Sequence, residues 1–364
     1  MIRIFEKDDT ARSGRMLGLC GLPDFTSCVV TEERNGDYYL EAEYPNDGEN
    51  AQEIMVDRLL SVKPNRIDGP ECFRIAKVEP SLDGIIKITA YHHSYDLKHI
   101  VVAPVAGTSN TAALWLNSLY TYALPATKPT FVFQSDTPEI TTGLPAVDRP
   151  MSMRQIMYGM EGSILDIYGG EYKFENIFVK LLQNRGKDTG KKIIYGVNMI
   201  SLNQQISSVD ACYGMIPYYR SDNGIVIGDP VMRTVSTDSY AAPFEMMDAV
   251  DLTETWDGVH GRENVPTKAM LDVFSLQRWP TIEAEPTVSM DVDYIELTDS
   301  PEYAFINSGS IGLCDTVTVV HPQSGLNVKS KIVKTVYNAL SGRYDAIVIG
   351  TIKKNLIDLL RRIK

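Results

Sequence analysis

The densest group of side chains that could bind a metal ion is formed by His92, His93, Asp96 and His99. If residues 91–99 formed one helix, His92, Asp96 and His99 would share a face, and imidazole and carboxylate groups suit a transition metal. However, His92 ends an alternating strand pattern, so the helical spacing does not hold across the group. The sequence therefore favours polar side chains at a strand end and in the loop after it.

Two further candidates lie in the second half of the chain. Asp291 and Asp293 flank Val292, so on a strand both carboxylates would point to one side, as a calcium site could use. No third oxygen ligand follows at a suitable spacing, so two solvated acids on a sheet face are expected. Cys212 could be a nucleophile only if the fold brought a histidine to it, and its apolar surroundings are more typical of a packed thiol.

A phosphate-binding loop is the remaining candidate, at Gly186-Lys187. Leu181 stands where the first glycine is required, and Asp188 replaces the Ser or Thr that holds magnesium. The patterns GxGxxG, HExxH and GxSxG are absent. The sequence therefore assigns no catalytic, cofactor-binding or metal-binding residue.

Composition excludes several classes of protein. The 364 residues predict two to three domains, and 44% hydrophobic with 23% charged residues predicts packed cores rather than disorder. Thirty-five basic against 47 acidic residues give a net charge of −12, which disfavours sequence-independent binding to duplex DNA. An acidic channel could still pass DNA without binding it.

Targeting and redox signals point to a soluble chain. The N-terminus, MIRIFEKDDT, has no apolar run of signal-peptide length, and no segment reaches the roughly 18–20 apolar residues that span a bilayer. The cysteines are odd in number and widely spaced, and they form no CxxC pair: Cys20, Cys28, Cys72, Cys212 and Cys314. We expect reduced, packed thiols made in a cytoplasm, and no membrane insertion.

The first hundred residues predict antiparallel strands. Tyr38, Leu40, Ala42 and Tyr44 alternate with polar or exposed positions, which is typical of a half-buried strand. Asn35-Gly36, just before it, predicts a hairpin with a type I′ turn, because both residues tolerate positive φ. Further strands are expected over residues 2–5, 26–33, 58–63, 72–79 and 84–93.

The middle of the chain predicts short helices and hairpins. We expect a helix over 111–124, capped at Ser109-Asn110, with Leu114, Leu116, Leu119 and Tyr122 at helical spacing. Two short helices are expected over 152–158 and 163–168, followed by a hairpin over 171–180, then strands over 193–195, 211–219 and 225–227.

The last third repeats the β character. The pattern predicts a helix over 266–279, with Met270, Val273, Phe274 and Gln277 on one side. Strands are expected over 287–297, 316–320, 330–337 and 345–350, and a basic amphipathic helix over 352–364. The predicted fold class is α+β, multi-domain and mostly antiparallel β. The 19 tyrosines could build an interface, although aromatic residues are also ordinary material for a sheet.

Several segments carry a resemblance that spans nearly the whole chain. They are MIRIF at 1–5, SCVVTEERNGDYYLEAEYP at 27–45, FRIAKVEPSLDGIIKITAYHHSYDL at 73–97, RPMSMRQIMYGMEGSILDIYGGEYKFENIFVKLLQNRGKDTGKKIIYG at 149–196 and LCDTVTVVHPQSGLNVKSKIVK at 313–334. The most specific runs are Glu161-Gly162-Ser163, Tyr168-Gly169-Gly170-Glu171 and Asn184-Arg185-Gly186. In this order the segments resemble the phage and prophage tail proteins called prophage endopeptidase tail or tail-associated lysin (Tal) proteins.

The resemblance implies a baseplate or tail-tip hub, similar in architecture to the central hub of contractile-tailed phages. It implies a homotrimer in which two β-barrel-like domains per subunit form a pseudo-sixfold ring, with an α/β insert that closes the tip. The implied domains are an N-terminal barrel at 1–95, a middle domain at 96–200, a β-rich segment at 201–255, a second barrel at 256–350 and the C-terminal helix at 351–364.

The implied partners are the hexameric distal tail protein, the tail tube, the tape measure protein and the host cell surface, with no sequence-specific nucleic-acid binding. The implied location is the virion tail tip, where the hub would close the tube and open for genome ejection.

The chain departs from the family pattern in two places. Leu313-Cys314-Asp315 stands where Leu-Gly-Asp is expected, which affects a local turn. Longer relatives continue into a cell-wall-degrading or peptidase module, whereas this chain stops at Lys364, so the lytic module appears absent and no catalytic residue is implied. The prediction is a structural hub that is not an enzyme. The alternatives are a cell-wall hydrolase or endopeptidase with a site in the middle region, and carbohydrate binding by exposed tyrosines.

Overall fold

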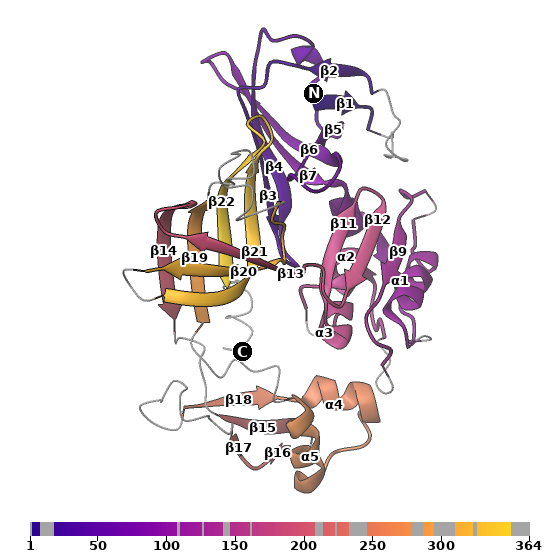
Figure 1. The fold of residues 1–364 in the computed structure, drawn as a ribbon. Helices are drawn as coiled ribbons and strands as arrows, with labels where there is room; N and C mark the ends of the chain where they lie inside the picture. The colour runs from indigo at the N-terminus through magenta and orange to yellow at the C-terminus, as the bar shows by residue number, and fades with distance from the viewer. Residues whose placement is uncertain are drawn as a thin grey trace. The chain divides into compact units, whose positions relative to one another are not determined.

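A computed structural model describes residues 2–7, 18–107, 110–125, 127–140, 146–160, 162–207, 214–222, 224–232, 246–278, 287–294, 310–322 and 326–350. Within these ranges the chain is mostly β-structure, in large antiparallel sheets with a few short helices (Figure 1). The chain forms two compact units. The first combines Met1–Asn203 with Met290–Ile352, and the described part of the second lies within Gln204–Ser289.

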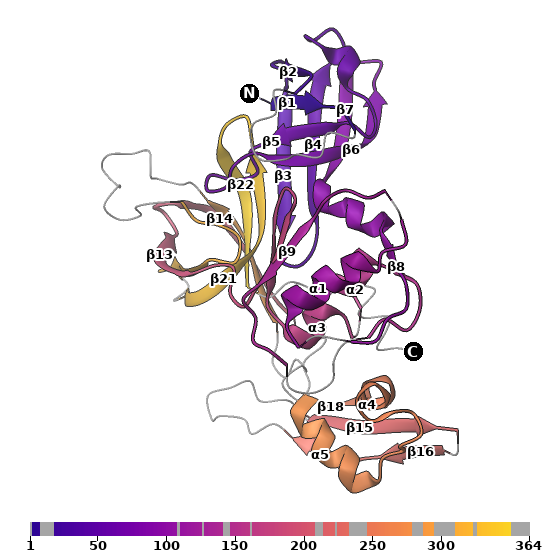
Figure 2. The same ribbon diagram turned by 90° about the vertical axis from the view of Figure 1, so that its right-hand side faces the viewer.

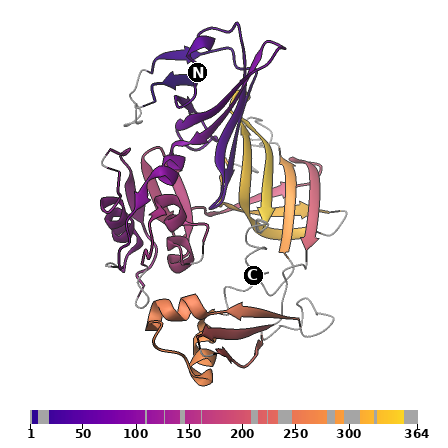
Figure 3. The same ribbon diagram turned by 180° about the vertical axis from the view of Figure 1, so that it is seen from behind.

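The first unit is built on one large sheet that joins the two ends of the chain. Its described strands run in the order β14-β19-β22-β21-β3-β4-β7-β6-β5-β1-β2, with β20 paired to β21 and β13 paired to β20. Strand β21 pairs antiparallel with β3, so residues more than 300 apart in the sequence lie side by side (Figure 3). The bounds are β1 Ile2–Phe5, β2 Cys20–Leu22, β3 Ser27–Glu33, β4 Tyr38–Pro45, β5 Leu59–Val62, β6 Glu71–Pro80, β7 Ile85–His92, β13 Asp188–Ile194, β14 Met199–Ser207, β19 Thr287–Tyr294, β20 Thr316–His321, β21 Leu326–Asn338 and β22 Arg343–Gly350.

The alternation predicted for the fourth strand is confirmed. Tyr38, Leu40, Ala42 and Tyr44 are buried on one face of β4, and Glu41 is exposed on the other. Because side chains alternate along a strand, this pattern fixes which face of the sheet contacts the core. The predicted strands over 2–5, 26–33, 58–63, 72–79 and 84–93 are also confirmed, with shifts of one or two residues at their ends.

A smaller α/β part of the same unit lies against this sheet. Its three-stranded sheet has the order β11-β12-β9, and helices α1, α2 and α3 gather beside it (Figure 2). The bounds are η1 Ala51–Glu53, η2 His93–His99, β8 Val101–Val102, α1 Ala112–Thr121, β9 Val132–Ser135, β10 Met151–Ser152, α2 Met153–Met157, α3 Ile164–Tyr168, β11 Glu171–Glu175 and β12 Phe178–Leu182, where η marks a 3-10 helix. The two short helices and the 171–180 hairpin follow the prediction.

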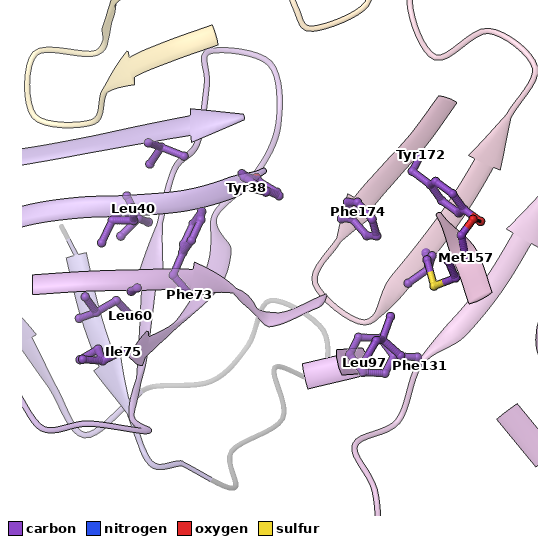
Figure 4. Close-up of a cluster of buried hydrophobic side chains, with 14 of the residues drawn as sticks. Tyr38, Leu40, Leu60, Phe73, Ile75, Leu97, Phe131, Met157, Tyr172 and Phe174 are labelled. Atoms are coloured by element: carbon purple, nitrogen blue, oxygen red, sulfur yellow. Dashed lines mark hydrogen bonds between the residues drawn. The ribbon is translucent and has the colours of Figure 1, made fainter. Parts of the chain in front are cut away.

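One continuous hydrophobic core joins the large sheet to the α/β part. Figure 4 shows side chains from both: Tyr38, Leu40, Leu60, Phe73 and Ile75 from the strands, and Leu97, Phe131, Met157, Tyr172 and Phe174 from the α/β part. Burial of apolar surface contributes about 25 cal/mol per Å², so this shared core is the main term that holds the two parts together.

The second unit has one sheet with helices beside it. Strand β15 (Gly214–Ser221) is central, with β16 (Gly224–Ile227) and β17 (Val231–Met232) antiparallel to it and β18 (Met247–Asp251) parallel. Helices α4 (Thr253–His260) and α5 (Lys268–Arg278) complete the unit. Its core is formed by Tyr219, Leu252, Trp256, Leu271 and Phe274. Helix α4 and strand β18 were not predicted from the sequence.

Two helices bury a face that matches the predicted one only in part. In α5, Leu271 and Phe274 are buried, whereas Met270 and Val273 are exposed. In α1, Trp115 is fully buried with Leu116 and Leu119, while Leu114 and Tyr122 are exposed. The α1 N-cap is Thr111, without a side-chain cap bond, rather than Ser109-Asn110. Each helix carries apolar residues on more than one side. The helical spacing alone therefore did not determine which side is buried. The helix predicted over 352–364 lies outside the described residues.

The β3–β4 hairpin is confirmed, but the predicted type I′ turn is wrong. Such a turn requires positive φ at both central residues, and only Asn35 has it, with φ 55°. The Asn35 amide explains this geometry. Its Nδ2 donates to the Gly170 carbonyl at 3.1 Å, and its Oδ1 accepts from the Tyr172 N–H at 2.8 Å. The turn is therefore shaped by a contact with β11 of the α/β part.

We expect Asn35→Ala to lower the free energy of unfolding by about 2–3 kcal/mol, because two hydrogen bonds are lost and a residue with a Cβ remains at positive φ. Asn35→Gly is the matched variant: it loses the same bonds but tolerates the backbone angle, so it should cost about 1 kcal/mol less. Urea denaturation checks both. Equal stability of the Ala and Gly variants would contradict the role of the backbone angle.

Candidate functional site

The Asn184-Arg185-Gly186 run places a charged side chain inside the first unit. The Arg185 guanidinium donates to Glu32 of β3 at 2.7 Å, and both side chains are only 6% exposed. A second guanidinium bond reaches the Tyr172 carbonyl of β11 at 3.1 Å. Burial alone would lower the pKa of Arg185, but the nearby Glu32 carboxylate outweighs it and raises that pKa. Arg185 is therefore charged and joins the large sheet to the α/β part.

Glu171 connects Arg185 to a lysine on one of the C-terminal strands. Its Oε1 accepts from Lys331 of β21 at 2.7 Å, and its Oε2 accepts from the Arg185 N–H at 2.9 Å. Arg34 lies 3.6 Å away. Burial raises the pKa of Glu171, but the hydrogen bond from Lys331 and the bond from Arg185 more than offset it and hold the pKa below its usual value. We call Glu32, Glu171, Arg185 and Lys331 the buried charge cluster.

The glycine of the same run packs against the turn at Leu313-Cys314-Asp315. A Cβ on Gly186 would lie 2.1 Å from the carbonyl carbon and oxygen of Cys314, so only glycine fits. The Lys187 N–H donates to Asp315 Oδ1 at 2.9 Å, and Asp315 Oδ2 accepts from the Gly312 N–H at 2.9 Å. Cys314 is fully buried and has φ 70°, a region that favours glycine. The loop considered as a phosphate site thus forms a structural contact here.

A second buried polar group ties β6 and β7 to the β11–β12 hairpin. Glu71 Oε2 accepts from the Asn176 N–H and lies 3.3 Å from His92 Nε2. The Ser94 N–H points at His92 Nδ1 at 3.2 Å, which assigns the ring proton to Nε2 and makes it the donor to Glu71. Asn176, with φ 49°, also accepts from the Cys72 N–H at 2.9 Å and donates to the Pro70 carbonyl at 3.1 Å.

This group is held in a neutral form by its surroundings. Burial raises the pKa of Glu71 to about 9, against the opposing hydrogen bond from Asn176. Burial likewise lowers the pKa of His92, which lies stacked on Tyr38 with ring centroids 4.4 Å apart. Although the two side chains are at ion-pair distance, desolvation dominates for both, so we describe them as a neutral hydrogen-bonded pair.

The four residues weighed as a metal site, His92, His93, Asp96 and His99, do not converge on one point, because only His93 and Asp96 meet and His99 is exposed. His92 meets Glu71, whereas His93 stacks on Phe131 with its Nδ1 3.0 Å from Asp96. Asp96 also pairs with Arg74 through two bonds of 2.8 and 2.6 Å. Within the residues that the structure describes, no group of three or more His, Cys, Asp or Glu could hold a metal ion. In the same residues no helix is long and apolar enough to cross a membrane.

The candidate nucleophile and the candidate calcium ligands have side chains that the structure does not describe. Cys212 lies outside the described residues. Asp291 and Asp293 lie in β19, where the backbone is described but the two carboxylates are not.

The buried charge cluster was missed by sequence reasoning, although one signal was present. Glu32 has the same strand parity as Cys28 and Val30, which are buried. A carboxylate at an inward position of a strand demands a cationic partner. The strand pattern alone could not identify Arg185 as that partner, since it comes from a loop more than 150 residues away.

The fold is shared with solved tail proteins. No family model matches this sequence, and no curated protein sequence matches it. The structure is similar to prophage tail protein gp18 from Listeria monocytogenes, with 12% identity, a TM-score of 0.58 and 94% of each chain covered. It is also similar to a 43 kDa tail protein of prophage MuSo2 from Shewanella oneidensis, with 11% identity, a TM-score of 0.57, and 90% of this chain and 94% of that chain covered.

A tail protein from Neisseria meningitidis is similar as well, with 9% identity, a TM-score of 0.56, and 90% of this chain and 92% of that chain covered. At these identities the likeness establishes the fold alone. The chain therefore has the fold of these tail proteins over nearly its whole length.

The backbone angle at Cys314 yields a prediction. Cys314→Ala loses the buried sulfur and keeps a side chain at positive φ, whereas Cys314→Gly relieves the angle. We expect the Gly variant to be more stable than the Ala variant by about 1 kcal/mol in urea denaturation, the reverse of their usual order in regular structure. An Ala variant as stable as or more stable than the Gly variant would contradict the strain.

The Glu71 carboxyl yields a prediction about pH. Burial raises its pKa in the folded state to about 9, well above the usual value of 4.5, so between these pH values the folded state holds a proton that the unfolded state releases. The contribution of the protonated Glu71 to the free energy of unfolding is fully present below about pH 4.5 and is lost as the pH rises towards 9. Glu71→Gln mimics the protonated acid, so its stability should fall less between about pH 5 and 9 than that of the unsubstituted chain. Parallel pH profiles from thermal unfolding would contradict a neutral Glu71.

Proposed function

We propose that this chain is a structural component of a phage or prophage tail and forms the baseplate hub at the tail tip. The observation that carries the proposal is the fold similarity to the Listeria prophage tail protein, which covers 94% of both chains. Similarity over the full length of two chains supports a common architecture better than a shared single domain would. The segments that resemble the Tal family support the same assignment.

The arrangement of the first unit suits an assembly platform. A hub must present several surfaces in fixed geometry to neighbouring subunits, and flexible joints would weaken each contact through lost entropy. Here the N-terminal and C-terminal strands share one sheet, and the buried charge cluster fixes the α/β part against it. This rigidity supports a role in assembly rather than in chemistry.

The finer proposal follows the family resemblance. The hub is a homotrimer whose two barrel-like domains per subunit form a pseudo-sixfold ring that docks on the hexameric distal tail protein. It contacts the tail tube and the tape measure protein, closes the tube at the virion tip, and opens for genome ejection at the host surface. The net charge of −12 is compatible with a lumen that passes DNA without binding it.

The mass in solution tests this proposal. Light scattering after gel filtration should give about three times the chain mass of 40.6 kDa for the chain alone or, after mixing with the distal tail protein of the same phage, the mass of a complex that contains three copies of this chain. A monomer under both conditions, at every concentration, would contradict the hub. Clearing of host cell walls in a zymogram by this chain alone would favour the hydrolase alternative.

A further inference from the structure

A long surface groove runs through the first unit, away from the buried charge cluster. Its volume is about 1700 Å³, and all its lining residues belong to this unit. One wall is the outer face of β4, β7 and β6, opposite to the face that contacts the core. The other wall is formed by η2, residues 125 and 127–129, and α2. Pockets for small molecules usually measure about 300–1,000 Å³, so this groove has room for a larger, extended ligand.

Three tyrosines form an aromatic platform in the groove. Tyr39 and Tyr91 are directly opposite each other on β4 and β7, with ring centroids 6.3 Å apart. Tyr95 of η2 follows with its ring 4.7 Å from that of Tyr91. Tyr91 is 37% exposed. Aromatic rings with one polar tip offer both an apolar face and a hydrogen-bonding hydroxyl to a ligand.

The platform is held in place by its neighbours. The Arg154 guanidinium of α2 lies over the Tyr95 ring at 3.6 Å from its centroid, and the Tyr95 hydroxyl donates to Asp37 at 2.9 Å. Below it, Arg74 pairs with Asp96 and donates to the Asp57 carbonyl at 2.7 Å. Side chains locked in this way lose little entropy when a ligand binds, which favours a preorganised site.

The charges around the platform have both signs. Glu41 and Asp57 line the groove with Lys98 and Lys128, and none of the four has an ion pair among the described residues. A strongly acidic ligand would be repelled by the carboxylates, and a strongly basic one by the lysines. A neutral chain rich in hydroxyl groups can donate hydrogen bonds to the two carboxylates and accept them from the two lysines.

We propose that this groove binds a neutral oligosaccharide chain, with sugar rings stacked on Tyr39 and Tyr91, which Tyr95 and Arg154 hold in place, and hydroxyl groups bonded to Glu41 and Lys98. The groove has the size for several sugar units, the aromatic faces for their apolar sides, and donors and acceptors of both kinds. This inference goes beyond the proposed hub and depends on no contact with another tail protein.

Binding is tested with an array of neutral bacterial polysaccharides, followed by affinity electrophoresis and calorimetry on the best neutral oligosaccharide. We expect Tyr91→Ala to weaken binding at least about tenfold, because one stacking face is lost. Glu41→Gln should weaken it severalfold, since a charged acceptor becomes a neutral one. Tyr195→Ala is the matched control, because Tyr195 is similarly exposed at 40% but lies outside the groove.

Salt distinguishes the ligand class. Binding of a neutral glycan should change less than about twofold between low and high salt, whereas an anionic polymer held by the lysines should lose most of its affinity. Three results would each overturn the proposal: no binding to any neutral polysaccharide on the array, an equal loss of affinity in the Tyr91 and Tyr195 variants, or an affinity that falls steeply with salt. The Tyr91 variant should keep the wild-type mass by light scattering, so this result is independent of the test of the hub.

Discussion

The burial of the Arg185 guanidinium is the constraint on which the first unit depends. A guanidinium that is 6% exposed is stable only if carboxylate and carbonyl oxygens surround it, and here they come from Glu32 and Tyr172. The partners lie on β3 and β11, far apart in the sequence. The chain must therefore bring the large sheet and the α/β part together in one relative position. Removal of one member of such a pair typically costs about 3–5 kcal/mol.

The contacts around Arg185 then determine how the ends of the chain meet. Gly186 lies against the Cys314 backbone, and Asp315 accepts from the Lys187 N–H, so the last third is attached to the same loop. Lys331 on β21 pairs with Glu171, and β21 pairs along β3. A one-residue slip of β21 would turn Lys331 away from Glu171, because side chains alternate along a strand. Charge and register are thus set together.

Many of the strands and the buried face of β4 could be predicted from sequence, whereas the order of the strands in the sheet and the tertiary contacts could not. Alternation in β4 and turn residues around it are local signals, and such signals located most strands of the first hundred residues, although not β2. The predicted type of the turn at Asn35 was wrong, because hydrogen bonds to Gly170 and Tyr172 determine its geometry. These residues lie far away in the sequence, so no local pattern includes them. The α5 face was right for Phe274 and wrong for Met270 and Val273, because these two are as apolar as Leu271, which is buried instead. Which stripe is buried depends on the sheet beneath it.

The same reasoning explains how a fold can persist at about 12% identity. Apolar core positions accept many residues of similar size, so two proteins with the same fold can differ at most of these positions. Positions such as Gly186 are more restricted, because a Cβ would enter the backbone of residue 314, and Arg185 is restricted by the number and geometry of its bonds. The facing turn carries strain of its own, because Cys314 keeps a side chain at a φ of 70°, an angle that glycine adopts more readily.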